Sequence, residues 1–270
     1  MNQIFPKAAW SNLTPLLAAV LSLLLAGCGQ PKSPPLRVGI NAWPPYEFLF
    51  LAQEKGFFRD AGVDVKLVEF GSLYDARQAF ENGKLDGWAA TLVEVVMVHD
   101  GAMRKPRILR LLDFSDGADV IIAGKDTQSI RDLRGKRVSL DEPGSGTLVD
   151  ARLILSAYGL KEADLQASYL PAQRVSDSLK AGNIDAFFSV SGWPQSAVAE
   201  LAATVGIELV PIAGPQAEAL IKQYAFFSAD EIPDLAYKGV EGVKTVGVHA
   251  LWVTSSKQPD DLIYQITAAL

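Results

Sequence analysis

Residues 132–160 read DLRGKRVSLDEPGSGTLVDARLILSAYGL and contain a short β-type run, a Gly-rich turn and an apolar-periodic segment, in that order. The run Val138–Leu140 predicts a strand, and the turn at 143–146 separates it from a helix that begins near Thr147 and ends at Gly159. This order places unpaired backbone N–H groups and the positive end of a helix at the carboxyl edge of a sheet. A small polar ligand can be held there, although an ordinary helix start has the same local pattern.

The chain contains this strand–turn–helix unit twice. Arg137-Val138 follows Arg37-Val38 by 100 positions, and Gly182–Asp185 follows Gly83–Asp86 by 99 positions. A duplicated βαβαβ half is the simplest account of these offsets. Alternating strands and helices predict an α/β fold with mainly parallel sheets and right-handed crossovers. We therefore expect two α/β lobes whose strand ends face a common cleft.

The predicted lobes are built from three stretches of chain. Residues 36–116 and 244–270 form the first lobe, and residues 117–243 form the second. The apolar runs Ala118–Ala123 and Thr245–Thr254 are expected to cross between the lobes as two hinge strands.

The N-terminal residues read as an address signal. Residues 1–27 contain an apolar run at Leu16–Leu25 that is too short for a permanent membrane span, and Leu25–Cys28 matches the bacterial lipobox. The alternative is an ordinary signal peptide with a chance cysteine. We expect a lipoprotein signal peptide, lipidation of Cys28, a tether at 28–35 and an extracytoplasmic protein anchored to the membrane. Cys28 is the only cysteine, which excludes disulfides and thiolate zinc sites.

Composition and motifs narrow the function further. The formal net charge is −6 and the chain has no Lys/Arg run, so no nucleic-acid surface is expected. The G-x-G-x-x-G, P-loop and G-x-S-x-G motifs are absent, and His99 and His249 have no metal-ligand spacing around them. The sequence therefore predicts no cofactor, no metal and no enzymatic activity, in a chain that acts as a monomer.

Two groups of motifs carry a family resemblance. The stretches 38–70 (VGINAWPPYEFLFLAQEKGFFRDAGVDVKLVEF) and 112–123 (LDFSDGADVIIA) resemble the nitrate, sulfonate and thiamine-precursor (NMT1/SsuA-like) class of periplasmic solute-binding proteins, which serve ABC importers. The stretches 143–160 and 178–194 (SLKAGNIDAFFSVSGWP) are more similar to the TAXI class, which works with TRAP transporters.

Both resemblances imply the type II periplasmic-binding-protein fold and capture of a small solute for an importer. The partner would be an ABC permease or the TRAP membrane subunits, and a ligand-sensing receptor for a signalling partner is a third reading. Pyrimidine-forming relatives of the thiamine-precursor class use a Cys-rich motif, which this chain lacks.

The candidate ligand residues follow strands of the two lobes. Donors are expected at the α-helix start in the second lobe, and aromatic walls are expected in the loops that precede helices. The candidates are Trp43, Tyr46, Thr91, Ser115, Asp116, Ser145, Gly146, Thr147, Ser191 and Trp193. The alternatives are a plain N-cap for Ser145 and Thr147, core packing for Trp43 and Tyr46, and a simple turn for Ser115 and Asp116.

The charge of the solute is the least constrained feature. No Arg or Lys lies in these loops, and a doubly charged anion usually needs a bidentate Arg. We therefore expect a neutral, zwitterionic or mono-anionic solute. Asp141 and Glu142 beside the Gly turn would suit an amine or a nitrogen heterocycle, or they are solvated loop acids.

Overall fold

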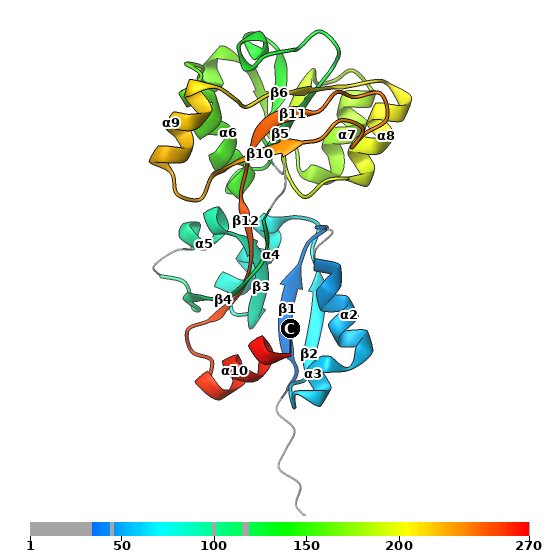
Figure 1. The fold of residues 1–270 in the computed structure, drawn as a ribbon. Helices are drawn as coiled ribbons and strands as arrows, with labels where there is room; N and C mark the ends of the chain where they lie inside the picture. The colour runs from blue at the N-terminus through cyan, green and yellow to red at the C-terminus, as the bar shows by residue number, and fades with distance from the viewer. Residues whose placement is uncertain (1–33, 44–45, 99–100, 115–118, 270) are drawn as a thin grey trace, which may run out of the picture. The chain divides into compact units, whose positions relative to one another are not determined.

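The computed structural model describes residues 34–43, 46–98, 101–114 and 119–269. Among these, five strands form a first sheet in the order β2-β1-β3-β12-β4 (Figure 1). Its strands are β1 (Leu36–Ile40), β2 (Val65–Glu69), β3 (Gly87–Thr91), β4 (Pro106–Phe114) and β12 (His249–Ser255). The helices that accompany it are α2 (Glu47–Lys55), α3 (Phe57–Asp60), α4 (Leu73–Glu81), α5 (Leu92–Met97) and α10 (Asp260–Ala268).

The second sheet has the order β10-β11-β5-β8-β6-β7, and β9 pairs with β5 beside this path. Its strands are β5 (Asp119–Ala123), β6 (Arg137–Ser139), β7 (Gln166–Ser168), β8 (Ala186–Val190), β9 (Glu208–Val210), β10 (Ser228–Ile232) and β11 (Val243–Gly247). Its helices are η2 (Ile130–Leu133), α6 (Gly146–Ala157), η3 (Glu162–Asp164), α7 (Ala172–Lys180), α8 (Ser196–Thr204) and α9 (Pro215–Gln223).

These sheets confirm the α/β type II fold, but they are mixed rather than mainly parallel. Parallel pairing joins β1 to β2 and β3, and joins β6 to β7 and β8. The other pairings in the described chain are antiparallel, because β12 in the first sheet, and β5 and β10 in the second, run opposite to the neighbouring strands. Alternation of strands and helices therefore predicted the duplicated halves correctly and missed the orientation of the strands added to them.

The duplication is visible atom by atom. Arg37 donates from its backbone N–H and its Nε to Asp86 Oδ2, at 3.0 Å each. Arg137 donates from the same two groups to Asp185 Oδ2, at 2.8 and 3.1 Å. Arg37 also donates to the carbonyl of Gly83, just after α4, and Arg137 donates to the carbonyl of Gly182, just after α7. The repeated Arg-Val and Gly-x-x-Asp motifs therefore make the same strand-end clamp in both halves.

The run Thr245–Thr254 divides into two strands rather than one. Its first part belongs to β11, which pairs with β10 and β5, and its second part belongs to β12, which pairs with β3 and β4. The segment that returns to the first sheet thus begins at His249, five residues after the expected boundary at 244. In the run Ala118–Ala123, the described residues lie in the second sheet as β5.

The helix boundaries follow local signals. The hydroxyl of Ser72 accepts from the N–H of Asp75 and caps α4, and Gly56 ends α2 in a left-handed conformation with φ of 79°. The structure adds α5 and β10, which the sequence did not predict. The α5 helix matters most, because it carries a residue of the candidate site.

Candidate functional site

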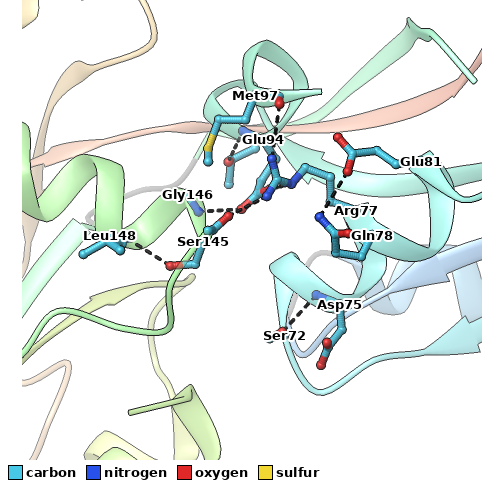
Figure 2. A network of polar contacts seen from close by, with 12 residues as sticks. Ser72, Asp75, Arg77, Gln78, Glu81, Glu94, Met97, Ser145, Gly146 and Leu148 are labelled. Carbon is cyan, nitrogen blue, oxygen red and sulfur yellow. Dashed lines mark hydrogen bonds and ion pairs between the residues drawn. The ribbon is translucent and has the colours of Figure 1, made fainter. Parts of the chain in front are cut away.

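The site is built around the start of α6, the helix that follows the Gly-rich turn. Ser145 is its N-cap, and the Ser145 hydroxyl accepts from the N–H of Leu148 at 3.1 Å. The N–H of Gly146 donates to Glu94 Oε1 at 2.7 Å (Figure 2). A carboxylate of the protein therefore occupies the place that we expected a ligand to take.

Glu94 reaches this place because of how α5 begins. Thr91 ends β3 and caps α5, and its hydroxyl accepts from the N–H of Glu94 at 3.4 Å. The Glu94 side chain is completely buried. A Cβ atom at Gly146 would lie 2.7 Å from Glu94 Oε1, so only glycine permits this approach.

Arg77 of α4 completes the arrangement, as Figure 2 shows. Its Nε lies 2.8 Å from Glu94 Oε2, and 5% of the Arg77 side chain is exposed. Its Nη1 donates to the carbonyl of Met97 at 3.3 Å, and its Nη2 donates to the carbonyl of Gly144 at 2.5 Å. The guanidinium carbon also lies 5.7 Å from the centre of the Tyr74 ring. Arg77 therefore holds Glu94 and the turn before α6 at once.

The electrostatics of Glu94 are balanced between opposing effects. Burial raises the pKa of Glu94 to about 7, against the charge of Arg77 and the hydrogen bond from Gly146, which lower it. The charges of Asp141 and Glu81 raise it further. Glu94 consequently changes protonation near neutral pH.

Asp141 forms hydrogen bonds with the hydroxyls of Ser145 and Thr147, which were expected to bind a ligand. Its backbone has a φ of 73°, an uncommon conformation for a residue other than glycine. Burial raises the pKa of Asp141, and hydrogen bonds with the Glu142 backbone, Ser145 and Thr147 lower it. The hydroxyls of Ser145 and Thr147 therefore already have partners within the protein.

Two further carboxylates are buried near the helix start. Asp119, the first residue of β5, and Asp150, on the second turn of α6, are each 2% exposed. Neither oxygen of the Asp119 carboxylate, nor Oδ1 of Asp150, has a hydrogen-bond partner within the described chain. Burial raises both pKa values, and the charges of Asp119 and Glu94 raise that of Asp150 further. Asp150 therefore lies within electrostatic reach of both Asp119 and Glu94.

Trp43 and Tyr46 lie in the loop between β1 and α2. Their rings stack with centroids 5.8 Å apart, and 2% and 1% of the two residues are exposed. Both belong to the largest core cluster, as the packing alternative predicted. The Trp43 Nε1 and the Tyr46 hydroxyl nevertheless have no partner among the described residues. These two polar atoms are therefore available for hydrogen bonds with a ligand, although the rings themselves are packed in the core.

The remaining candidates are distributed as follows. Ser191 and Trp193 follow β8 and are half-buried, and Trp193 packs against the second core cluster. Thr91 is buried as the cap of α5. Ser115, Asp116 and Cys28 lie outside the described residues. The structure thus brings Ser145, Gly146 and Thr147 together with residues that the sequence analysis did not select.

A hollow of about 750 Å³ lies at the carboxyl ends of β1 and β2 beside α2. Its lining includes Asn41 and Ala42, which directly precede Trp43, together with Phe48 and Leu51 of α2, which are 67% and 47% exposed. Ligands of open α/β sheets bind at this edge of the strands. The hollow therefore lies at the edge of the first sheet where this rule places a ligand.

Arg77, Glu94, Asp119 and Asp150 are the site residues that sequence analysis missed. Two signals were available. Thr91-Leu92-Val93-Glu94 has the T-x-x-E pattern of a helix start, and Arg77 lies on a face of α4 that also carries Ala76 and Phe80. A charge on an apolar face predicts a buried partner, although it does not identify that partner.

Within the described ranges, no group of three or more His, Cys, Asp or Glu residues could hold a metal ion. No helix in that part of the chain is both long enough and apolar enough to cross a membrane.

Solved structures share the fold of this chain. The alkanesulfonate-binding protein SsuA from Xanthomonas axonopodis pv. citri bound to MOPS matches with a TM-score of 0.62 and 15% identity, over 89% of this chain and 73% of that one. The periplasmic nitrate-binding protein NrtA from Synechocystis matches with a TM-score of 0.58 and 15% identity, over 89% of this chain and 62% of that one. PhnD1 from Prochlorococcus marinus in complex with methylphosphonate matches with a TM-score of 0.58 and 14% identity, over 87% of this chain and 82% of that one. At these identities the likeness establishes the periplasmic-binding-protein fold.

Curated relatives contradict one expectation from the sequence. The 4-amino-5-hydroxymethyl-2-methylpyrimidine phosphate synthase THI13 of Saccharomyces cerevisiae is 23% identical over 168 residues, which cover 61% of this chain and 48% of the relative. The synthase THI12 of the same yeast matches over the same lengths. The prediction that excluded enzymatic activity is therefore wrong as it stood, because these relatives are named as enzymes. It rested on the isolated His99 and His249, on the absence of nucleotide-binding and nucleophile motifs, and on the missing Cys-rich motif. The chain spans about half the length of the curated relatives it matches.

The family match falls on the second half of the chain, where the TAXI resemblance was expected; that resemblance stays a prediction. The model of the NMT1-like family matches residues 119–270, more than half of the sequence. This chain belongs to the NMT1-like family.

Proposed function

We propose that this chain is an extracytoplasmic solute-binding protein that captures a small organic solute at the start of α6 and delivers it to an importer. The observation that carries this proposal is a set of buried polar atoms without partners in the described chain. These atoms are Asn41 Oδ1, Trp43 Nε1 and Tyr46 OH after β1, Asp141 Oδ1 and Glu142 Oε1 after β6, and Trp193 Nε1 after β8.

Their distribution supports a binding role. In folded proteins nearly all buried polar groups have hydrogen-bond partners, so an unsatisfied group needs an explanation. The six atoms named above lie in loops that follow strands of both sheets, at the edge where ligands of α/β folds bind, and Asp119 and Asp150 add unsatisfied oxygens in β5 and α6. A solute with donors and acceptors would supply the missing hydrogen bonds.

The mechanism that fits this fold is closure of two sheet-based lobes about their connecting strands. A solute that contacts both lobes only in the closed form shifts the population toward that form. The turn at Gly144–Gly146 and the side chains of Arg77 and Glu94 already bridge the two lobes, so they are placed to respond to a solute.

The membrane partners are proposed from the same reasoning. An ABC permease is the first choice, because structural neighbours are named as alkanesulfonate- and nitrate-binding proteins. TRAP membrane subunits, for a TAXI-type protein, and a signalling partner, for a sensor, are the alternatives. Lipidation of Cys28 would keep the monomer at the outer face of a membrane.

A second candidate function is chemistry on a pyrimidine. The match to the yeast 4-amino-5-hydroxymethyl-2-methylpyrimidine phosphate synthases favours it. In that case the bound compound would be converted rather than released unchanged. Mass spectrometry of compound recovered after incubation with the protein separates the two functions.

The test of solute binding is a thermal-shift screen of the purified protein against amino acids, sulfonates, carboxylates, amines and pyrimidines. A solute that binds the folded state raises the unfolding midpoint with dose. Ser145→Pro with Thr147→Ala should abolish that shift without changing the circular dichroism spectrum. If no compound of the panel stabilises the wild-type protein, the proposed function fails.

A further inference from the structure

We propose that Glu94 determines the charge of the solute: it occupies the oxyanion position at the start of α6, so that the site admits cations and donor-rich neutral solutes and rejects oxyanions. This inference rests on the proposed function and adds the chemical class of the ligand. It also goes beyond the solute expected from the sequence, which included mono-anions.

The position that Glu94 occupies has the features of an oxyanion site. The N–H of Gly146 lies at the positive end of a helix of 12 residues, and it donates to Glu94 Oε1 at 2.7 Å. Arg77 supplies the cation at 2.8 Å from the other carboxylate oxygen. Both groups that would attract an oxyanion are therefore already satisfied by the protein's own carboxylate.

The fit of Glu94 is specific to these neighbours. A Cβ at Gly146 would lie 2.7 Å from Glu94 Oε1, and a Cβ at Gly144 would lie 2.7 Å from the Tyr74 ring. Two glycines thus let the turn approach α4 and α5 closely. An oxyanion that approached Gly146 would meet the Glu94 charge in a buried setting, where like charges repel strongly.

A second observation concerns the charge of the ligand. Asp119 and Asp150 are 2% exposed, and three of their four carboxylate oxygens lack a hydrogen-bond partner in the described part of the chain. A buried carboxylate requires donors or a cation. Burial raises the pKa of each group, and a bound ammonium, amidinium or similar cation opposes that shift and satisfies the ionised oxygens as acceptors, whereas an oxyanion would raise both pKa values further.

The structural neighbours provide the contrast. The proteins with this fold named above are described as binding an alkanesulfonate, nitrate or methylphosphonate, each of which presents oxygen acceptors. In this chain the acceptors belong to the protein. The fold is therefore shared while the polarity of the site is reversed.

The test uses two probes that share a ring and differ in charge, benzamidine (a cation at neutral pH) and benzenesulfonate. Their dissociation constants are measured by thermal shift and calorimetry on the full chain and on Glu94→Ala. The variant removes one carboxylate and leaves Arg77 and the Gly146 N–H facing an open space. Glu81→Ala, on the same helix as Arg77, is the matched control for the loss of one negative charge.

We expect benzamidine and not benzenesulfonate to stabilise the wild-type protein. Glu94→Ala should bind benzenesulfonate at least tenfold more tightly than wild type, and Glu81→Ala should not. Adding Arg77→Met to Glu94→Ala should remove the gain, an effect that a purely structural role of Glu94 would not produce. Asp119→Asn should weaken benzamidine at least tenfold.

Benzenesulfonate that binds wild type as tightly as Glu94→Ala would overturn the role of Glu94. Failure of benzamidine to bind wild type would overturn the cationic class. If Glu94→Ala does not fold by circular dichroism, Glu94→Ser, which also vacates the position of the carboxylate, takes its place with the same expected gain. Failure of the proposed function has a different signature: no compound of the wider panel then stabilises the wild-type protein. The gain in benzenesulfonate binding by the Glu94 variant can be measured whether or not that happens.

Discussion

Arg77 and Glu94 form an ion pair of 2.8 Å between α4 and α5, with 5% and 0% of their side chains exposed. Burial of two charges is expensive, and attraction between them offsets that cost only when the pair is intact. The pair also joins the first sheet's helices to the turn before α6, through the Gly144 carbonyl and the Gly146 N–H. Substitution of either partner should therefore lower the free energy of unfolding, whether or not a solute is present.

Arg77→Met should destabilise the protein by about 3–5 kcal/mol at pH 8, because it leaves the Glu94 carboxylate buried without its cation. The double variant Arg77→Met, Glu94→Gln should recover part of this loss, since no ionised group is then left unpaired. The free energy of unfolding from urea titration measures both. Equal losses in the single and double variants would show that the pair is not coupled in stability.

The pH dependence of stability follows from the raised pKa of Glu94. Its folded value of about 7 lies above the ordinary value of 4.5, so the folded state binds more protons than the unfolded state between these values. The free energy of unfolding should therefore fall as pH rises from 4.5 to 7, by about 1.4 kcal/mol per unit and about 3 kcal/mol in total. Above pH 7 the loss from this group is complete.

Other charged groups near Glu94 also affect the pH dependence of stability, so a variant is needed to isolate its contribution. Arg77 on α4 lowers its pKa, and Asp141 and Glu81 raise it. Burial also raises the pKa values of Asp119 and Asp150, so both groups make the free energy of unfolding fall as pH rises, as Glu94 does. Glu94→Gln should therefore flatten the urea-unfolding slope without abolishing it. An unchanged slope in this variant would mean that Glu94 is ionised throughout the range.

The sequence predicted the repeated half-sheets well, because each repeat carries its own anchor. Arg37 with Asp86, and Arg137 with Asp185, fix one strand start to the next at the same offset. The antiparallel strands had no such marker. A run of apolar residues such as Thr245–Thr254 has the same composition whether it is one strand or two, and only the pairing partners distinguish the cases.

The candidate site was predicted in part for a related reason. The Gly-rich turn and helix start are local in sequence, so Ser145, Gly146 and Thr147 could be chosen from the pattern. Glu94 lies 52 positions from Gly146 and Arg77 lies 67 positions from Gly144. Contacts over such separations depend on how sheets and helices pack, and no spacing rule for one chain segment contains them.

Gly146→Ala tests the close approach of Glu94 to α6. A Cβ there would lie 2.7 Å from Glu94 Oε1 and 3.4 Å from its Cγ, so the carboxylate must move from the N–H that it accepts from. Loss of a charge-assisted hydrogen bond predicts destabilisation of about 1.5–3 kcal/mol, although alanine itself favours a helix. Gly101→Ala is the control, since a Cβ there meets nothing within 4 Å. Thermal unfolding that is equal in the two variants would contradict the contact.

The two strand-end clamps should be unequal in strength. Asp86 accepts from Arg37 and lies 3.1 Å from Arg104, with 14% of its side chain exposed, whereas Asp185 faces Arg137 and is 31% exposed. Burial opposes the lowering of the Asp86 pKa by Arg37 and Arg104, and the hydrogen bond from Arg137 dominates the lowered pKa of Asp185.

Asp86→Asn should therefore cost about 1–3 kcal/mol at pH 7, and Asp185→Asn should cost less, because its ion pair is closer to solvent. A lowered pKa stabilises the fold above the ordinary value near 3.8, and this contribution is lost as pH falls through the lowered value. Urea unfolding at pH 7 and pH 3 should show the difference between each variant and wild type shrinking at the lower pH. A larger loss in Asp185→Asn would mean that the second clamp, and not the first, bears more of the stability of its half, since both make the same backbone contacts.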